Sequence, residues 1–249
     1  TFFAAPTVTG LSPTAGPTGG TTSVVVTGTD FTGAMAVKFG ATNATSFSVD
    51  SATQITATAP AGSGTVDVTV TTPGGTSATS AADQYSYVAA PTVSALSPNS
   101  GPTAGGTVVV LTGTNFTGAT AVTFGATNAT GFTVNSATQI TATAPAGTGT
   151  VNVTVTTAGG TSATGAGNQY AYVAAPTVTG LSPTSGPTAG GTVVVLTGTN
   201  LIGATAVKFG ATNATGFTVN SATQITATAP AGTGTVNVTV TTAGGTSAT

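Results

Sequence analysis

Residues 151–156 read Val151-Asn152-Val153-Thr154-Val155-Thr156, a strict alternation of apolar and polar side chains. Because successive side chains of a β-strand point to opposite faces, this order places the valines on one face and the polar residues on the other. Just upstream, residues 139–144 read Gln-Ile-Thr-Ala-Thr-Ala and alternate in the same way before Pro145. These two segments predict strands with one face turned toward a core.

Strand-like segments continue on both sides of this pair. Residues 107–112, Thr-Val-Val-Val-Leu-Thr, form a β-branched run typical of a buried central strand. Residues 121–125 and 131–134 give two shorter strands, and residues 169–173, Gln-Tyr-Ala-Tyr-Val, give the last. Gly, Pro, Asn and Ser separate the segments, and nothing reads as a helix of more than one turn. Short strands spaced by about 8–12 residues predict an antiparallel β-sandwich.

The core of this sandwich is predicted from the apolar positions of its strands. We expect it to contain Val93, Leu96, Val108, Val110, Phe116, Val122, Phe124, Phe132, Val134, Ile140, Val151, Val153, Val155, Tyr170 and Tyr172.

The whole pattern occurs three times with a spacing of 85 residues. Residues 91–164 and 176–249 differ at six of 74 positions, and the first copy is the most divergent. We therefore expect modules at residues 6–90, 91–175 and 176–249, preceded by a terminal strand, residues 1–5, of another module. A disordered mucin-like stalk would share the Ser, Thr and Pro content but not the period of two.

Charged residues are almost absent, and this excludes several classes of function. The chain has two lysines, four aspartates and no Arg, Glu, His, Cys or Trp, so 2% of its residues are charged, against about 25% in ordinary domains. Nucleic-acid binding needs clustered Lys or Arg, and zinc, haem and iron–sulfur sites need His or Cys. We expect no cofactor, no metal site, no catalytic residue and no enzyme activity. No apolar run is long enough to span a membrane.

So few titrating groups also predict how stability depends on pH. We expect a nearly flat stability curve between about pH 5 and pH 9.

The quoted segments resemble the IPT/TIG domain family. In the second copy the resemblance runs from Leu-Ser-Pro-Asn-Ser-Gly-Pro at 96–102 through Thr-Gly-Thr-Asn-Phe at 112–116 to the strands at 139–144 and 151–156. It covers all three copies and is most similar to the bacterial cell-surface branch, whose modules occur in tandem as spacers, stalks and fibre material. It implies an all-β chain of three immunoglobulin-like (E-set) antiparallel sandwiches in a rod-like array. The basic residues of the family's DNA-binding members have no counterpart here.

Three groups of residues are candidate sites, and each also has a structural interpretation. Residues 101–106, Gly-Pro-Thr-Ala-Gly-Gly, lack the Lys of a phosphate loop and are expected to form a turn. Asp30 and Asp50 are too isolated for calcium, and the second copy has Asn at both places. The pairs Tyr85/Tyr87 and Tyr170/Tyr172 suit core packing better than a sugar platform.

Two covalent modifications were also considered. A Lys–Asn cross-link normally needs a buried acid beside the lysine, and the second copy has Thr123 where the others have Lys38 and Lys208. Glycan attachment stays open, because Asn-x-Ser/Thr triplets occur at Asn43, Asn115, Asn128, Asn152, Asn213 and Asn237.

Two functions remain. The preferred one is a structural subunit or segment of an extracellular filament or cell-surface fibre, whose partner is another copy or module of itself. The alternative is the spacer stalk of an adhesin or carbohydrate-binding protein whose tip lies outside this segment. Residues 88–91 and 173–176, Val-Ala-Ala-Pro, leave no flexible linker between modules, which favours a rod.

The third copy stops at the equivalent of Thr164, before its last strand. A sandwich without that strand exposes an open core and an unpaired edge. We expect a strand equivalent to residues 1–5 to complete it, with Phe2 in the place of Tyr172. That strand would come either from a longer covalent array, which we favour, or from the next subunit by strand addition.

Overall fold

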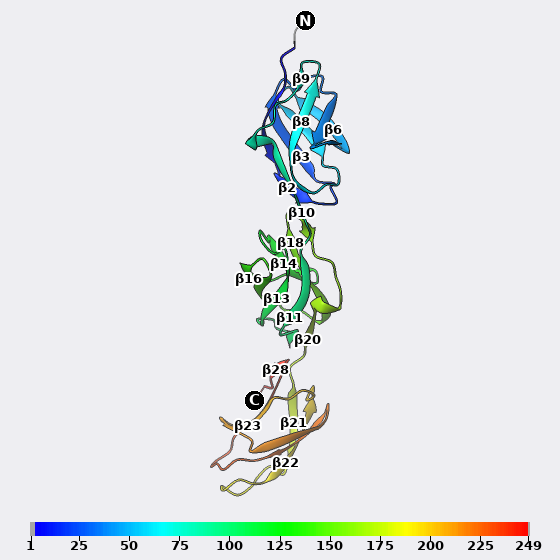
Figure 1. Ribbon diagram of the computed structural model, residues 1–249. Helices are drawn as coiled ribbons and strands as arrows, with labels where there is room; N and C mark the ends of the chain where they lie inside the picture. Colours follow the sequence, from blue (N-terminus) through cyan, green and yellow to red (C-terminus); the bar gives the residue numbers. More distant parts are fainter. Residues whose placement is uncertain (1–2, 249) are drawn as a thin grey trace.

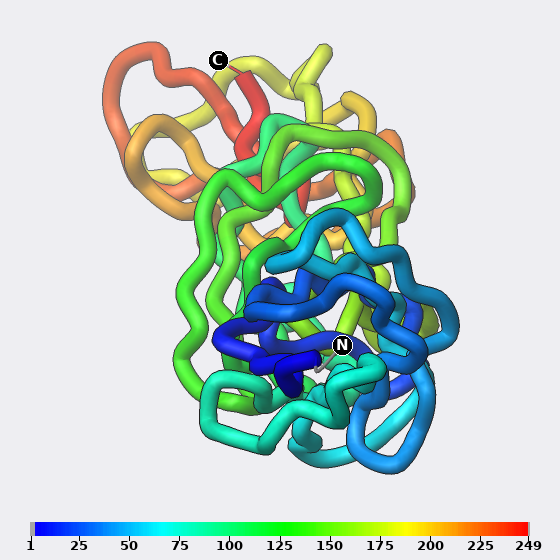
Figure 2. Tube along the Cα trace, turned by 90° about the horizontal axis from the view of Figure 1, so that it is seen from above, coloured from blue at the N-terminus to red at the C-terminus, as the bar shows by residue number. Residues whose placement is uncertain are grey.

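The computed structural model describes residues 3–248 and shows three β-sandwich modules in line (Figure 1). Residues 3–90 lie at the end marked N, residues 91–175 lie in the middle, and residues 176–248 lie at the other end. Seen along the long axis, the modules lie one behind another with a lateral offset (Figure 2). The predicted all-β architecture of tandem antiparallel sandwiches is confirmed.

Module 1 packs two sheets face to face. The first is antiparallel, in the order β1 (Thr7–Ser12), β3 (Ser23–Thr29), β7 (Gln54–Thr58), β6 (Ser46–Ser51). The second has the order β2 (Ala15–Pro17), β10 (Gln84–Val88), β8 (Gly64–Thr72), β4 (Ala36–Phe39), β5 (Thr42–Asn43), with β9 (Gly75–Thr76) also pairing β8. A single 3₁₀ turn, η1 (Ala81–Asp83), leads into β10.

Module 2 repeats this order. Its first sheet runs β11 (Thr92–Ser97), β13 (Val108–Thr114), β17 (Gln139–Thr143), β16 (Gly131–Ser136). Its second runs β12 (Ser100–Pro102), β20 (Gln169–Val173), β18 (Gly149–Thr157), β14 (Ala121–Phe124), β15 (Thr127–Asn128), with β19 (Gly160–Thr161) pairing β18 and η2 (Ala166–Asn168) before β20.

Module 3 keeps the first sheet but has a smaller second one. The first sheet runs β21 (Thr177–Ser182), β22 (Val193–Thr199), β26 (Gln224–Thr228), β25 (Gly216–Ser221). The second runs β24 (Thr212–Asn213), β23 (Ala206–Phe209), β27 (Val238–Thr242), β28 (Gly245–Thr246). Within residues 176–248 no strand corresponds to β2/β12 or to β10/β20, so one side of this sandwich is open.

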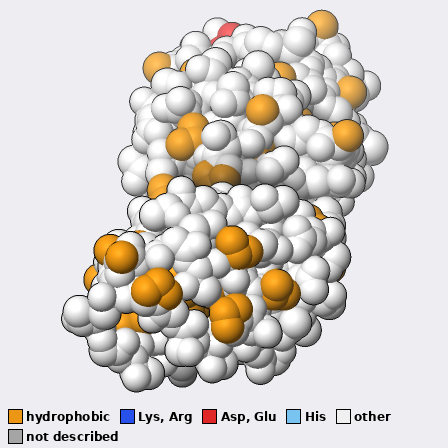
Figure 3. Space-filling view, turned by 90° about the horizontal axis from the view of Figure 1, so that it is seen from below, with side chains coloured by type: hydrophobic (Ala, Val, Ile, Leu, Met, Phe, Trp, Pro, Cys, Tyr) orange, Lys and Arg blue, Asp and Glu red, His pale blue; other side chains and the backbone are white. Residues whose placement is uncertain are grey.

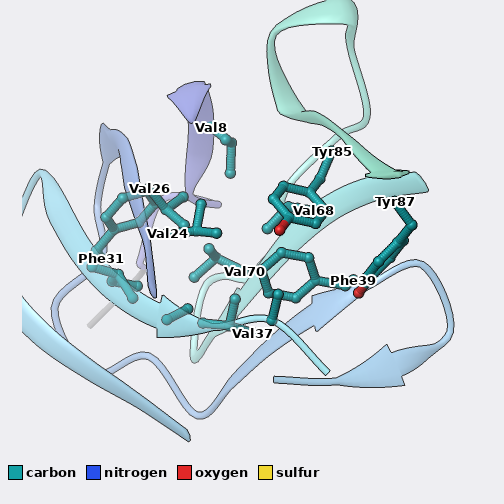
Figure 4. Close-up of a cluster of buried hydrophobic side chains, with 13 residues drawn as sticks. Val8, Val24, Val26, Phe31, Val37, Phe39, Val68, Val70, Tyr85 and Tyr87 are labelled. Atoms are coloured by element: carbon teal, nitrogen blue, oxygen red, sulfur yellow. The ribbon is translucent and has the colours of Figure 1, made fainter. Parts of the chain in front are cut away.

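The strands that carry the tyrosine pairs, β10 and β20, contribute to the cores of modules 1 and 2 as expected. Tyr85 is fully buried and Tyr87 is 8% exposed, and the ring of Tyr85 meets those of Phe39 and Tyr87 edge to face at 5.1 Å (Figure 4). Tyr170 and Tyr172 repeat this arrangement on Phe124. The prediction that these pairs are core residues is confirmed.

One part of the predicted core is wrong by one residue. Val108 is 57% exposed and Val110 is only half-buried, whereas Val109 and Leu111 are fully buried. An unbroken apolar run carries no sign of which face is inward, and a shift of one residue turns every side chain to the other face. The first copy does indicate which face is outward, because the polar residue Ser23 stands at the position of Val108. Val93, Leu96, Phe132, Val134 and Val151 pack against the core but are only partly buried.

The inward phase of β13 predicts unequal effects for two neighbouring substitutions. Val109→Thr buries a hydroxyl in an apolar core and should destabilise module 2 by about 1–3 kcal/mol. Val108→Thr makes the same change on the exposed face and should stay within about 0.5 kcal/mol. Amide hydrogen exchange of β13 and β17 in the full chain measures both. Equal effects, or a larger effect at Val108, would contradict this register.

Candidate functional site

Asp30 has a structural role, because its backbone adopts a left-handed conformation. It adopts φ 59°, and Asn115 and Asn200 at the same place in the other modules adopt 58° and 55°. This left-handed region is tolerated by Asn and Asp better than by other side chains, which explains both residue types here. Asp30 also accepts a hydrogen bond from the Thr29 hydroxyl at 3.0 Å.

Asp50 lies on the exposed strand β6 and accepts hydrogen bonds from the hydroxyls of Ser48 and Thr56 at 2.9 and 2.6 Å. Across residues 3–248, no three His, Cys, Asp or Glu side chains gather into a group able to hold a metal ion.

The glycine-rich segment 101–106 begins in strand β12 and continues into a turn, and the amides of its last two glycines are already used. Gly105 and Gly106 have φ of 78° and 83°, which glycine adopts without strain. Their N–H groups donate to the carbonyl oxygens of Pro102 and Ala144 at 2.9 and 2.8 Å. These two amides are therefore not free to bind an anion.

The lysines lie outside the core. Lys38 on β4 and Lys208 on β23 are exposed, and Thr123 at the same place in module 2 pairs with the Thr154 hydroxyl at 2.8 Å. A Lys–Asn cross-link forms in a buried setting, so these positions do not suit one.

Asp83 is a buried carboxylate that the sequence alone did not reveal. Its Oδ2 accepts a hydrogen bond from the Ser80 N–H at 2.9 Å, while its Oδ1 is buried without a hydrogen-bond partner. Burial raises the pKa of this carboxyl above its usual value, and the nearby charge of Asp67 adds to the rise. Module 2 has Asn168 here, whose Nδ2 donates to the Ala163 carbonyl at 3.0 Å. An amide therefore satisfies the site that the carboxylate leaves partly unsatisfied.

Each joint between modules depends on a glycine in one hairpin of the following module. This hairpin connects β18 to β19 in module 2 and β27 to β28 in module 3, and its equivalent in module 1 connects β8 to β9. A Cβ on Gly159 would overlap the carbonyl oxygen of Ala89 and meet that of Val88 at 2.9 Å. Gly244 stands in the same relation to Ala174 and Val173. The chain leaving one module thus lies directly on the hairpin of the next, where only glycine leaves room.

A second contact holds the same segments. The Asn115 Nδ2 donates to the Ala90 carbonyl at 3.1 Å, and the Asn200 Nδ2 donates to the Ala175 carbonyl at 3.1 Å. The amide of Asn115, part of one of the Asn-x-Thr triplets, is therefore committed to the joint. Both joints use the same residues in the same way.

The start of the described chain follows this pattern as well. A Cβ on Gly74 would overlap the carbonyl of Ala4, as Gly159 does with Ala89. Residues 3–6 form no strand, and Phe3 is 61% exposed at the far end of the molecule from module 3 (Figure 1). The expected placement of Phe2 in the third module lies outside the described residues.

The open side of module 3 is a groove of about 430 Å³. Its lining includes Leu181, Gly186, Phe209, Gly232 and Val236. On the face drawn in Figure 3, apolar side chains form separate spots on a surface that is mostly neither apolar nor charged. Of residues 3–248, no helix has the length and apolarity needed to cross a membrane.

A model of the IPT/TIG domain family matches residues 6–87, 91–172 and 176–249. No curated protein matched the sequence.

Among solved structures, the plexin A4 extracellular region is 24% identical, with 92% of this chain aligned to 21% of that one at a TM-score of 0.47. SGBP-B from a xyloglucan utilization locus of Bacteroides uniformis is 21% identical over 81% of this chain and 64% of its own, with a TM-score of 0.31. The Escherichia coli adhesin FdeC is 16% identical over 96% and 91%, with a TM-score of 0.31.

The environment of Asp83 predicts how the stability of module 1 depends on pH. Because the folded pKa is raised, the folded module binds more protons, and its stability falls as pH rises from the unfolded pKa, about 3.9, through the folded value. The nearly flat curve expected between about pH 5 and pH 9 stays a prediction, since Asp83 titrates upward from an acidic starting value. Asp83→Asn should remove the dependence and stabilise module 1 by about 1–2 kcal/mol at pH 7.

Urea unfolding of the full chain at several pH values measures this effect. The reverse change, Asn168→Asp, is the matched control and should confer a pH dependence of the same sign but smaller size on module 2, which has Asn152 in the place of Asp67. If Asp83→Asn lowers stability at pH 7, this account of the site is wrong.

Proposed function

The chain belongs to the IPT/TIG domain family, and we propose that it is a structural segment of an extracellular filament or cell-surface fibre built from repeated immunoglobulin-like modules. The observation that carries this proposal is the joint, in which Gly159 and Gly244 seat the incoming chain by the same contacts. A joint that is packed on backbone atoms and tied by an amide resists bending. A rod that repeats one joint can be extended without a new kind of contact.

The near-identity of modules 2 and 3 also supports a structural role. Residues 91–164 and 176–249 differ at six of 74 positions, and nearly every loop residue is shared. A ligand-binding module would differ from its neighbours in its loops, because loops carry most binding residues. Modules that share their loops are suited to the same task.

The near absence of charged residues favours association between copies of the chain. With 2% charged residues, like-charge repulsion between copies is weak. Contacts between copies would rest on apolar packing and backbone hydrogen bonds, which salt does not screen.

The proposal assigns the chain no catalytic step. Asp83 is buried near a second acid, Asp67, and the two lysines are exposed on β4 and β23, and a fibre role does not draw on these groups for acid–base chemistry. A spacer stalk for an adhesin or a carbohydrate-binding tip is the alternative, since a rigid rod serves that role equally well.

Immunogold electron microscopy of intact producing cells tests the proposal. Antibodies raised against this chain should label filaments along their length, and sheared filaments should contain the chain as their main component. Label at one site beneath a different distal protein would indicate the stalk instead. Label confined to the cell interior would contradict both functions.

The joint predicts a second measurable effect. The side chain of a Gly159→Val variant would overlap the backbone of Ala89, so this change should loosen the arrangement of modules 1 and 2. Because the chain lacks cysteine, spin labels can be placed at Asn43→Cys and Asn128→Cys, which are exposed and equivalent in the two modules. The distribution of distances between the two spin labels, measured by electron–electron double resonance, should be narrow in the parent chain and clearly broader in the Gly159→Val chain.

Gly131→Val is the matched control, because a Cβ there meets no atom within 4 Å. It should leave the distribution unchanged. A parent distribution as broad as that of the Gly159→Val chain would show that the joint is not rigid.

A further inference from the structure

One of the Asn-x-Thr triplets is present at the same place in all three modules. It reads Asn-Ala-Thr at residues 43–45, 128–130 and 213–215, with a spacing of 85 residues. Module 1 is the most divergent copy, and it still contains this triplet. The three modules therefore share one position at which a sugar acceptor is encoded.

The other triplet positions are not shared by all modules. At the place of Asn115, module 1 has Asp30, and residues 200–202 of module 3 read Asn-Leu-Ile, which lacks the Ser or Thr. At the place of Asn152, module 1 has Asp67. Each of these places thus offers a triplet in only part of the chain.

The shared triplet begins on an exposed edge strand. Asn43, Asn128 and Asn213 lie on β5, β15 and β24, and all three are exposed. Each of these strands is two residues long and stands at one end of the strand order of its sheet. A sugar is a bulky group that requires such a surface position, and an edge strand leaves one side of the asparagine open.

The asparagines of module 2 that lie at the other triplet positions have less suitable surroundings. The Nδ2 atom of Asn115 donates to the Ala90 carbonyl at 3.1 Å, so a sugar on that nitrogen would have to fit into the joint between modules 1 and 2. Asn152 is half-buried on β18, where it pairs with Gln169, and β18 lies between β20 and β14. A sugar on Asn152 would press on the neighbouring strands.

We propose that Asn43, Asn128 and Asn213 are attachment sites for N-linked sugars. In the transfer, catalysed by a separate enzyme, the asparagine amide nitrogen attacks the anomeric carbon of a sugar activated as a diphosphate. A C–N bond forms, the C–O bond to the diphosphate breaks, and the amide gives up one proton. Each module then carries one sugar at the free edge of its second sheet.

A sugar at this place has a physical consequence for the sides of the rod. An edge strand presents unpaired backbone groups to other chains, and natural edges often carry lysine against such pairing. Lys38 and Lys208 stand opposite the asparagines of modules 1 and 3, but module 2 has Thr123 there. A bulky hydrophilic sugar covers all three edges alike. The inference goes beyond the proposed function, because it concerns the sides of the rod and not its extension.

Tandem mass spectrometry of the chain purified from intact producing cells tests the proposal. Peptides from a protease of broad specificity should carry sugar on Asn43, Asn128 and Asn213, and peptides with Asn115 or Asn152 should be unmodified. A bare asparagine at any of the three shared positions would overturn the proposal, and so would sugar on Asn115 or Asn152. An unmodified chain recovered from filaments would overturn this inference and leave the fibre proposal standing.

Variants of module 2 made in the same cells identify the attached atom. Asn128→Gln should abolish the sugar on this peptide, and so should Thr130→Ala, because it destroys the triplet. Thr130→Ser keeps a triplet and should keep the sugar. Asn128 is exposed, so its replacement should change stability by no more than about 0.5 kcal/mol.

Asn152→Gln is the matched control, because it removes a triplet from the same module at the half-buried position. It should change the mass of the chain by the substitution alone. Sugar that persists in the Asn128→Gln chain would be bound to a hydroxyl group and would overturn the proposal. Loss of sugar in the Asn152→Gln chain would overturn it as well.

Discussion

The strand that carries the two tyrosines is the part of the structure on which the rest depends. Tyr85 and Tyr170 are fully buried against Phe39 and Phe124, which lie two strands along in the same sheet, so β10 and β20 complete the cores of their modules. The same strands continue without a linker into Ala-Ala-Pro, which lies on the glycine hairpin of the next module. Core closure and module alignment are therefore fixed by one continuous segment, because a shift of the strand in its own sandwich would move the joint.

Module 3 shows how much of a strand depends on its partner. Residues 185–187 and 234–237 have the sequences of β12 and the first half of β18, yet they leave the sheet where no tyrosine strand lies between them. Strand formation is thus set by pairing with a distant segment and not by local propensity.

The period of two in Val-Asn-Val-Thr-Val-Thr and the spacing of the tyrosines were enough to predict the sandwich and most of its core. The phase of β13 was not, because a run of four apolar residues lacks the alternation that tells one face from the other. The burial of Asp83 and the close contacts of Gly159 and Gly244 could not be predicted from the sequence, for a different reason. Burial of a carboxylate and close approach of Gly159 to Ala89 depend on contacts between segments far apart in the chain. No spacing within one repeat encodes those contacts.

The central claim is that these modules form an extended rod, and small-angle X-ray scattering of the purified chain tests it most directly. Modules of about 35–45 Å each predict a radius of gyration of about 35 Å and a cross-section of one sandwich. A compact chain of the same length would have a radius of gyration of about 18 Å. A measured value near the larger figure supports the rod, and a value near the smaller one, with a single symmetric distance distribution, would contradict it.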